Sequence, residues 1–131
     1  MKFLALSVLI FASLTTMAQQ PMSLLVGSKA PKIEAVDNNG EAFSLEQTLK
    51  NGPVVVVFYR GEWCSYCNRH MAALEESLTQ FKKLGVSVVA ITPELAKYVK
   101  KTVKKTSASF SIISDPNHKI MDEWRVSFVL D

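Results

Sequence analysis

The chain has 131 residues, which at roughly 100–200 residues per domain leaves room for one domain. Its 15 Lys and Arg against 12 Asp and Glu give a formal charge of +3, which makes no case for nucleic-acid binding, and a hydrophobic fraction of 48% excludes a disordered chain. Two cysteines are too few for a disulfide-dense scaffold or a four-cysteine zinc site, so a single cysteine pair is the informative feature.

Residues 1–18 have the pattern of a cleaved secretory signal. Lys2 gives a basic start, residues 3–14 are almost wholly apolar, and Thr16 and Ala18 are small residues just before the expected cut. This apolar run is shorter than the roughly 20 residues that a membrane span needs. We therefore expect export to the periplasm or the extracellular space without a stable membrane anchor, in a compartment where cysteine pairs can stay oxidised.

Residues 19–30 show no clear periodicity and are expected to form a linker ahead of a folded domain over residues 31–131. Polar and apolar residues alternate over 32–36, a turn sequence follows at 37–40, and residues 42–44 can return as a second short strand. These features predict a small hairpin at the start of the domain.

Ser44 and Gln47 have the spacing of a capping box, which predicts a short helix that ends near Lys50. Residues 54–59 then read Val-Val-Val-Val-Phe-Tyr, a continuous apolar run rich in β-branched residues. Such a run is typical of a strand that is covered on both faces.

Helices and strands alternate along the rest of the chain. Apolar residues recur at helical spacing in a long helix that starts near Cys67 and in a second helix that has Pro93 in its first turn and ends near Thr106. The expected inner residues are Met71, Leu74, Leu78 and Phe81 in the first of these helices, and Leu95, Val99 and Val103 in the second. Further strands are expected over 86–91, 110–113 and 126–130, with a short helix that reaches Trp124 before the last. This alternation predicts an α/β fold with a mostly parallel sheet, in which functional groups gather at the carboxyl ends of the strands.

Cys64 and Cys67 form a Cys-x-x-Cys motif where the first buried strand gives way to the long helix. Unpaired N–H groups at the start of a helix favour a nearby negative charge, so the pKa of a thiol there falls. We expect Cys64 at the exposed end and Cys67 about one turn inside, with one thiol attacking and the other resolving. Arg60 would favour ionisation of Cys64 and Glu62 would oppose it, and the sequence leaves open which is closer.

The sequence allows three alternatives to redox chemistry. A structural disulfide here would close a very short loop, which stabilises a fold less than a bridge between distant cysteines. Metal handling by both thiolates is the second, but His70 completes only a three-ligand string and no metal site is expected. An inactive fragment is the third.

The string from Phe58 to Cys67, FYRGEWCSYC, resembles the peroxiredoxin-like branch of the AhpC/TSA family, within the thioredoxin-fold superfamily. Residues 27–31, 88–93 and 114–116 carry weaker motifs in the same order, and the resemblance covers about residues 26–131. It implies a thioredoxin-like fold, with Cys64 as the nucleophile and Cys67 as the resolving cysteine of a redox disulfide. It also implies thiol-dependent antioxidant reduction of peroxides or of disulfides, with electrons from a thioredoxin-like donor and no cofactor.

The chain departs from these relatives at several positions. Peroxiredoxins carry a threonine three residues before the nucleophile and a proline seven before it, where this chain has Gly61 and Val57. Thioredoxins carry a buried acid six residues before the first cysteine, where this chain has Phe58, and a cis-proline in a later strand, which has no counterpart after Pro116. Gly61 favours disulfide exchange, whereas the overall likeness favours peroxide reduction.

Two further expectations concern surfaces. Trp63 precedes the cysteine pair and is expected to shield the thiolate and contact a substrate protein. Tyr66 lies between the two cysteines and is expected to tune the redox potential. The chain also stops near the end of a strand where the fold normally continues with another strand and helix. We therefore expect a C-terminally truncated domain with an uncovered sheet edge, which is marginally stable or associates with itself.

Overall fold

The computed structural model describes residues 23–127, and a three-stranded parallel sheet forms its centre. The strands are β3 (Val54–Phe58), β4 (Ser87–Thr92) and β5 (Ser111–Ser114), with β4 in the middle. Both neighbouring pairs are parallel, so the carboxyl ends of all three strands lie at the same edge of the sheet. The expected mixed α/β architecture with a parallel sheet is confirmed.

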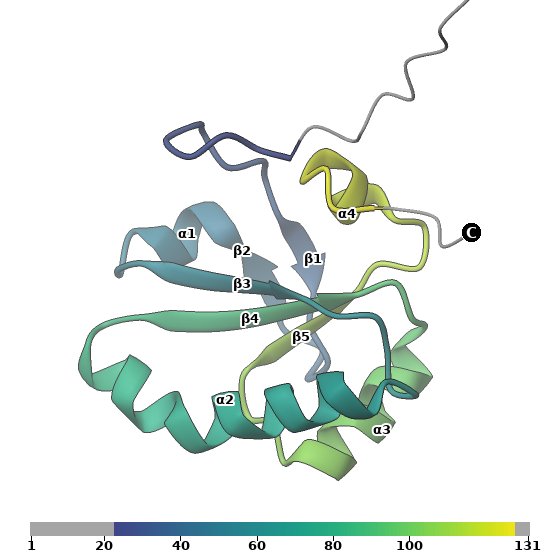
Figure 1. The fold of residues 1–131 in the computed structure, drawn as a ribbon. Helices are drawn as coiled ribbons and strands as arrows, with labels where there is room; N and C mark the ends of the chain where they lie inside the picture. Colours follow the sequence, from purple (N-terminus) through teal and green to yellow (C-terminus); the bar gives the residue numbers. More distant parts are fainter. Residues whose placement is uncertain (1–22, 128–131) are drawn as a thin grey trace, which may run out of the picture.

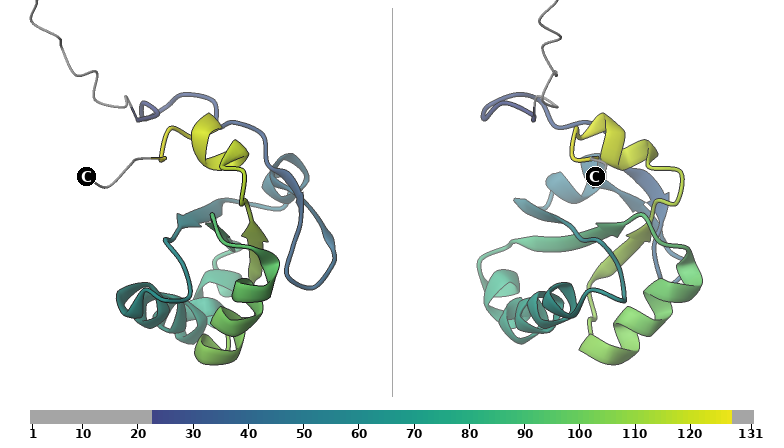
Figure 2. Two further views of the ribbon diagram at one scale, coloured as in Figure 1. Left: turned by 90° about the vertical axis from the view of Figure 1, so that its right-hand side faces the viewer. Right: turned by 45° about the vertical axis from the view of Figure 1, so that its right-hand side comes forward.

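Helices cover both faces of this sheet (Figures 1 and 2). One face carries the two long helices, α2 (Ser65–Lys83) and α3 (Ala96–Thr106). The other face carries α1 (Leu45–Leu49), α4 (Lys119–Glu123) and an antiparallel hairpin of β1 (Glu34–Val36) and β2 (Ala42–Ser44).

The side chains of β4 point alternately to the two faces of the sheet and so contribute to the core on both sides. Val88 and Ala90 pack against α2 and α3, while Val89 and Ile91 pack against α1, α4 and the hairpin. Successive side chains of a strand point to opposite faces, so a strand that is covered on both sides must be apolar throughout. This geometry explains the continuous apolar runs in the sequence.

Most element boundaries follow the predictions, and the start of α3 does not. The helix begins at Ala96, so Pro93 lies before it rather than in its first turn, and Leu95 is 51% exposed rather than part of the inner stripe. Hydrogen bonds of the Glu94 backbone explain why α3 starts later than predicted. The Glu94 N–H donates to Thr92 Oγ1, and the Glu94 carbonyl accepts from the Ser114 hydroxyl. These bonds hold residue 94 in a bend above the sheet.

Several predictions fall outside the described residues. These are the signal over 1–18, the first part of the linker, and most of the strand expected over 126–130, of which Val126 and Ser127 are described and have no strand partner. Residues 23–33 precede the first strand, and the boundary between linker and domain stays a prediction. No helix within residues 23–127 is both long enough and apolar enough to cross a membrane.

Hydrogen bonds of the buried Asp37 carboxylate link the hairpin to β5. This carboxylate accepts the N–H groups of Asn39 and Glu41 at 2.8 and 3.1 Å and the hydroxyl of Ser111 at 2.8 Å. Burial opposes ionisation of Asp37, but the hydrogen bonds from Ser111, Glu41 and Asn39 outweigh it and hold the pKa of the carboxyl below its ordinary 3.8.

Asp37→Asn is expected to lower the free energy of unfolding by about 1–2 kcal/mol at neutral pH, because a neutral amide oxygen accepts the N–H groups of Asn39 and Glu41 less strongly than a carboxylate does. The pKa of Asp37 is lower in the folded chain, so its contribution is complete above the ordinary carboxyl pKa and is lost as the pH falls through the folded value. Urea unfolding of both proteins between pH 7 and pH 2 measures this, with the exposed Asp122→Asn as control. A gap between wild type and Asp37→Asn that does not shrink in acid would contradict the assignment.

Candidate active site

The cysteine pair occupies the first turn of α2, directly beyond the carboxyl end of β3. Cys64 is the N-cap residue, with an extended backbone, and its Sγ accepts the N–H of Cys67 at 3.3 Å. A disulfide joins Cys64 to Cys67, whose Cα atoms are 5.2 Å apart. The Cys64 sulfur therefore lies at the positive end of the helix dipole, as the sequence predicts.

The relative exposure of the two cysteines is the reverse of the prediction. Cys64 is only 3% exposed, whereas Cys67 is partly exposed and packs at the edge of the core beneath α2. A helix N-cap has an extended backbone, and here its side chain folds back onto the first turn of the helix rather than pointing outward. A hollow of about 280 Å³ reaches both sulfurs and is lined by residues that include Arg60, Tyr66 and His70.

Arg60, and not Glu62, is the charged residue that contacts Cys64. The Arg60 Nη2 atom lies 3.3 Å from Cys64 Sγ. The Glu62 carboxylate points toward α3, where Lys105 Nζ lies 2.6 Å from Glu62 Oε1. The hydrogen bond from Lys105 holds the pKa of Glu62 below its ordinary value. A thiolate at Cys64 would thus have a guanidinium beside it and no facing carboxylate from Glu62.

Replacing Arg60 with leucine is expected to raise the pKa of the Cys64 thiol by about one unit, because the nearest positive charge is lost. The measurement is the pH dependence of Cys64 alkylation in a Cys67→Ser background, where a single thiol reacts. Arg69→Leu is the matched control, since Arg69 lies over the Tyr66 ring at 4.7 Å on the same helix end. Equal pKa values in the Arg60 and Arg69 variants would show that the guanidinium at Cys64 does not affect ionisation.

Two exposed aromatic side chains lie beside the cysteines in the sequence. Trp63 is 62% exposed and Tyr66 75% exposed, and each carries an arginine over its ring, with Arg60 at 5.0 Å from the Trp63 centroid. Their exposure fits the expectation that Trp63 contacts a partner protein. His70 is exposed on α2.

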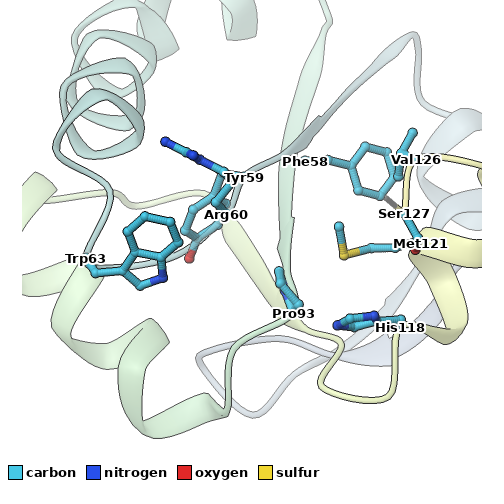
Figure 3. A pocket seen from close by; sticks show the side chains of 9 residues that line it. All are labelled: Phe58, Tyr59, Arg60, Trp63, Pro93, His118, Met121, Val126 and Ser127. Carbon is cyan, nitrogen blue, oxygen red and sulfur yellow. The ribbon is translucent and has the colours of Figure 1, made fainter. Parts of the chain in front are cut away.

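A second hollow lies on the other side of β3's carboxyl end, with a volume of about 250 Å³. Figure 3 shows Trp63 at one end of it and Met121 and His118 at the other, with Pro93 between them. Tyr59 and Arg60 line both hollows, and burial raises the pKa of the Tyr59 hydroxyl above its ordinary 10.0. Tyr59 therefore stays neutral at physiological pH.

One residue at the site was missed by the sequence reasoning. Glu94 lies two residues beyond the end of β4, and its carboxylate accepts the backbone N–H of Glu62 at 2.7 Å. The rule that functional groups gather at the carboxyl ends of parallel strands, applied to β4 as well as β3, is the signal that could have found it. Within residues 23–127, no group of three or more His, Cys, Asp or Glu side chains is placed to hold a metal ion.

The sequence model of the AhpC/TSA family matches residues 26–129. A chloroplastic peroxiredoxin Q of Oryza sativa subsp. japonica is 36% identical over 100 residues, which are 76% of this chain and 46% of that protein. This chain thus spans about half the length of the curated relative it matches.

Two solved structures share the fold. Peroxidoxin BcpB from Mycobacterium tuberculosis superposes with a TM-score of 0.73 at 21% identity, over 79% of this chain and 68% of that one. The thioredoxin domain of a thiol-disulfide oxidoreductase from Bacteroides vulgatus superposes with a TM-score of 0.68 at 22% identity, over 81% and 77% of the two chains. These likenesses confirm the thioredoxin-like fold that the sequence predicts.

Proposed function

Because the chain belongs to the AhpC/TSA family, we propose that it is a thiol-dependent oxidoreductase in which Cys64 is the nucleophile and Cys67 resolves the intermediate. The observation that carries this proposal is the Cys64–Cys67 disulfide at the start of α2, with Arg60 Nη2 on Cys64 Sγ. A structural bridge would not need a cation beside one sulfur. A hollow that reaches both sulfurs provides an approach for a substrate.

In the disulfide reaction, the Cys64 thiolate attacks one sulfur of the substrate disulfide and the other sulfur leaves as a thiolate that takes up a proton. Cys67, after losing its proton, attacks Cys64 Sγ in the mixed disulfide and releases the second substrate thiol. Two electrons pass to the substrate and the Cys64–Cys67 disulfide remains. A thioredoxin-like dithiol donor then reduces this disulfide and is itself oxidised.

Gly61 favours a disulfide as the substrate. It occupies the position where peroxiredoxins carry threonine, and it offers no side chain to orient a peroxide. A Cβ at residue 61 would come within 2.5 Å of Glu94 Oε1 and 2.7 Å of Trp63 Nε1, so a side chain here would displace Glu94 and Trp63. The exposed Trp63 and Tyr66 provide contacts for a protein substrate.

Peroxide reduction is the second candidate, favoured by the relative named peroxiredoxin Q. In that reaction the Cys64 thiolate attacks the terminal peroxide oxygen and the O–O bond breaks, which leaves a sulfenic acid and an alcohol or water. Cys67 then displaces water from Cys64 Sγ. The product is the same disulfide.

Stopped-flow mixing of the fully reduced protein with insulin and, separately, with hydrogen peroxide distinguishes the two. We expect rapid oxidation of the protein by the insulin disulfides and oxidation by peroxide at the rate of a free thiol. Rapid oxidation by peroxide alone would establish the second candidate. Free-thiol rates with both would refute a redox function.

Export is proposed on the pattern of residues 1–18, in which Thr16 and Ala18 precede the cut. An oxidising compartment would supply the disulfide state seen between Cys64 and Cys67. N-terminal sequencing of the protein recovered from its host tests this, with Gln19 expected as the first residue. A chain that still starts at Met1 would refute export by this route.

Self-association is proposed at the free edge of β3. Within residues 23–127, β3 pairs only with β4, so its other edge presents unpaired N–H and C=O groups between half-buried valines. Sedimentation velocity over a hundredfold range of concentration tests this. A single monomer species throughout would refute it.

A further inference from the structure

Glu94 joins the cysteine loop to the central sheet. Its Oε2 atom accepts the N–H of Glu62 at 2.7 Å, a contact between residues 32 positions apart in the sequence. The bond reaches the backbone two residues before Cys64, in the turn of residues 61–63. The carboxylate that accepts this bond is partly buried.

Glu94 is itself held firmly. Its N–H donates to Thr92 Oγ1 at 3.4 Å, and its carbonyl accepts from the hydroxyl of Ser114. Thr92 ends β4 and Ser114 ends β5, so both neighbouring strands fix the backbone from which the carboxylate extends. A backbone that is hydrogen-bonded to the ends of two strands can set the position of the loop, rather than follow it.

The loop packs directly on the carboxylate at Gly61. A Cβ added to Gly61 would lie 2.5 Å from Glu94 Oε1, closer than real side chains approach. The glycine thus lets the backbone come near enough for the N–H of Glu62 to reach Glu94. Glu62 has two further partners at other atoms. Its side-chain carboxylate contacts Lys105, and its backbone carbonyl accepts a hydrogen bond from the Asn68 amide.

The turn that Glu94 holds connects Arg60 to Cys64, the two residues that contact each other in the site. Arg60 immediately precedes it and Cys64 follows it, and Arg60 Nη2 lies 3.3 Å from Cys64 Sγ. Glu94 does not line the hollow that reaches the sulfurs. The titratable and charged groups that do line it beside the cysteines are Tyr59, Arg60, Tyr66 and His70, so Glu94 does not contact the sulfurs through the hollow, and its link to the site is the hydrogen bond to the turn.

We propose that Glu94 is a positioning residue, whose carboxylate holds the turn of residues 61–63 so that Arg60 stays in contact with Cys64 Sγ. This inference rests on the proposed thiol chemistry of Cys64. The length of the side chain, and not its charge, is what matters, because an acceptor must reach the Glu62 N–H. Loss of the acceptor frees the turn and lets the guanidinium leave the sulfur.

Two conservative variants distinguish the effect of the length of the Glu94 side chain from the effect of its charge. Glu94→Asp keeps the charge but is one methylene too short to reach the N–H of Glu62, whereas Glu94→Gln keeps an oxygen acceptor at full length and loses the charge. The readout is the pH dependence of Cys64 alkylation by iodoacetamide, in the Cys67→Ser background so that one thiol reacts. Glu76→Ala, an exposed site on α2, is the control.

We expect the thiol pKa to rise by about half a unit to one unit in Glu94→Asp, which slows alkylation at acidic pH by about threefold to tenfold. Glu94→Gln should react like the parent, or slightly faster in acid. An unchanged Cys64 pKa in Glu94→Asp would overturn the inference. Equal shifts of this pKa in the two variants, or a rise in Glu94→Gln alone, would also overturn it. An ordinary thiol pKa in the parent itself would instead refute the proposed function.

Discussion

Replacing Cys64 with serine is expected to reduce thiol-dependent turnover to the uncatalysed background, because a serine hydroxyl does not ionise near neutral pH and forms no disulfide. Cys67→Ser is expected to behave differently. Its Cys64 thiolate can still attack, but the mixed disulfide has no internal thiol to resolve it. Mass spectrometry of the reaction should then show a stable adduct on Cys64 in Cys67→Ser and no adduct in Cys64→Ser.

Ser65→Ala is the matched control, since Ser65 is exposed between the two cysteines on the same helix turn. Full activity in this variant would show that the loss in Cys64→Ser reflects the sulfur and not a disturbed helix start. The opposite result, with a stable adduct on Cys67 in Cys64→Ser and no adduct in Cys67→Ser, would exchange the roles of the two cysteines. Turnover in both serine variants would refute dithiol chemistry.

Shortening Ile91 to alanine is expected to lower the free energy of unfolding by about 3 kcal/mol, within the range measured for large-to-small changes in cores. Ile91 is fully buried in β4, the middle strand, and packs into the layer formed by α1, α4 and the hairpin. The cavity left behind would lie in the centre of the sheet, where neighbouring strands cannot collapse to fill it.

Urea unfolding measures this cost, with the slope of the transition as a check that the unfolded states remain comparable. Val36→Ala is the matched control, because Val36 is 63% exposed in β1 and should change stability by less than about 0.5 kcal/mol. A cost for Ile91→Ala as small as that of the control would place residue 91 outside the core.

Local signals in the sequence were sufficient for most of the fold. The four consecutive valines from Val54 predict a strand covered on both faces. The Ser44 half of the capping box also forms as expected, with Ser44 Oγ accepting the Gln47 N–H at 3.4 Å, whereas the Gln47 side chain bonds to Lys50 instead. The spacing of Met71 and Leu78 predicts the buried face of α2. Each signal depends on residues a few positions apart, and the physics of helices and strands relates such residues directly.

Local signals failed where distant residues compete for the same backbone. Pro93 is well suited to the first turn of a helix, yet the helix begins at Ala96 because contacts with Thr92 and Ser114 hold Glu94 in a bend. The buried position of Cys64 was missed for a related reason. Its exposure depends on how its side chain folds back at the helix start and on the hollow around it, and a motif does not specify either.

The sequence by itself determined the parallel α/β sheet, the placement of Cys64 and Cys67 at a strand-to-helix junction, and the family. Only the tertiary structure decided which charges face the sulfur, since Glu62 meets Lys105 and Glu94 at sequence separations of 43 and 32 residues. Contacts at such separations arise when packed strands and helices bring their ends together, so no periodicity or motif encodes them. The Cys64 sulfur consequently has Arg60 beside it, while the neighbouring Glu62 is held by other parts of the fold.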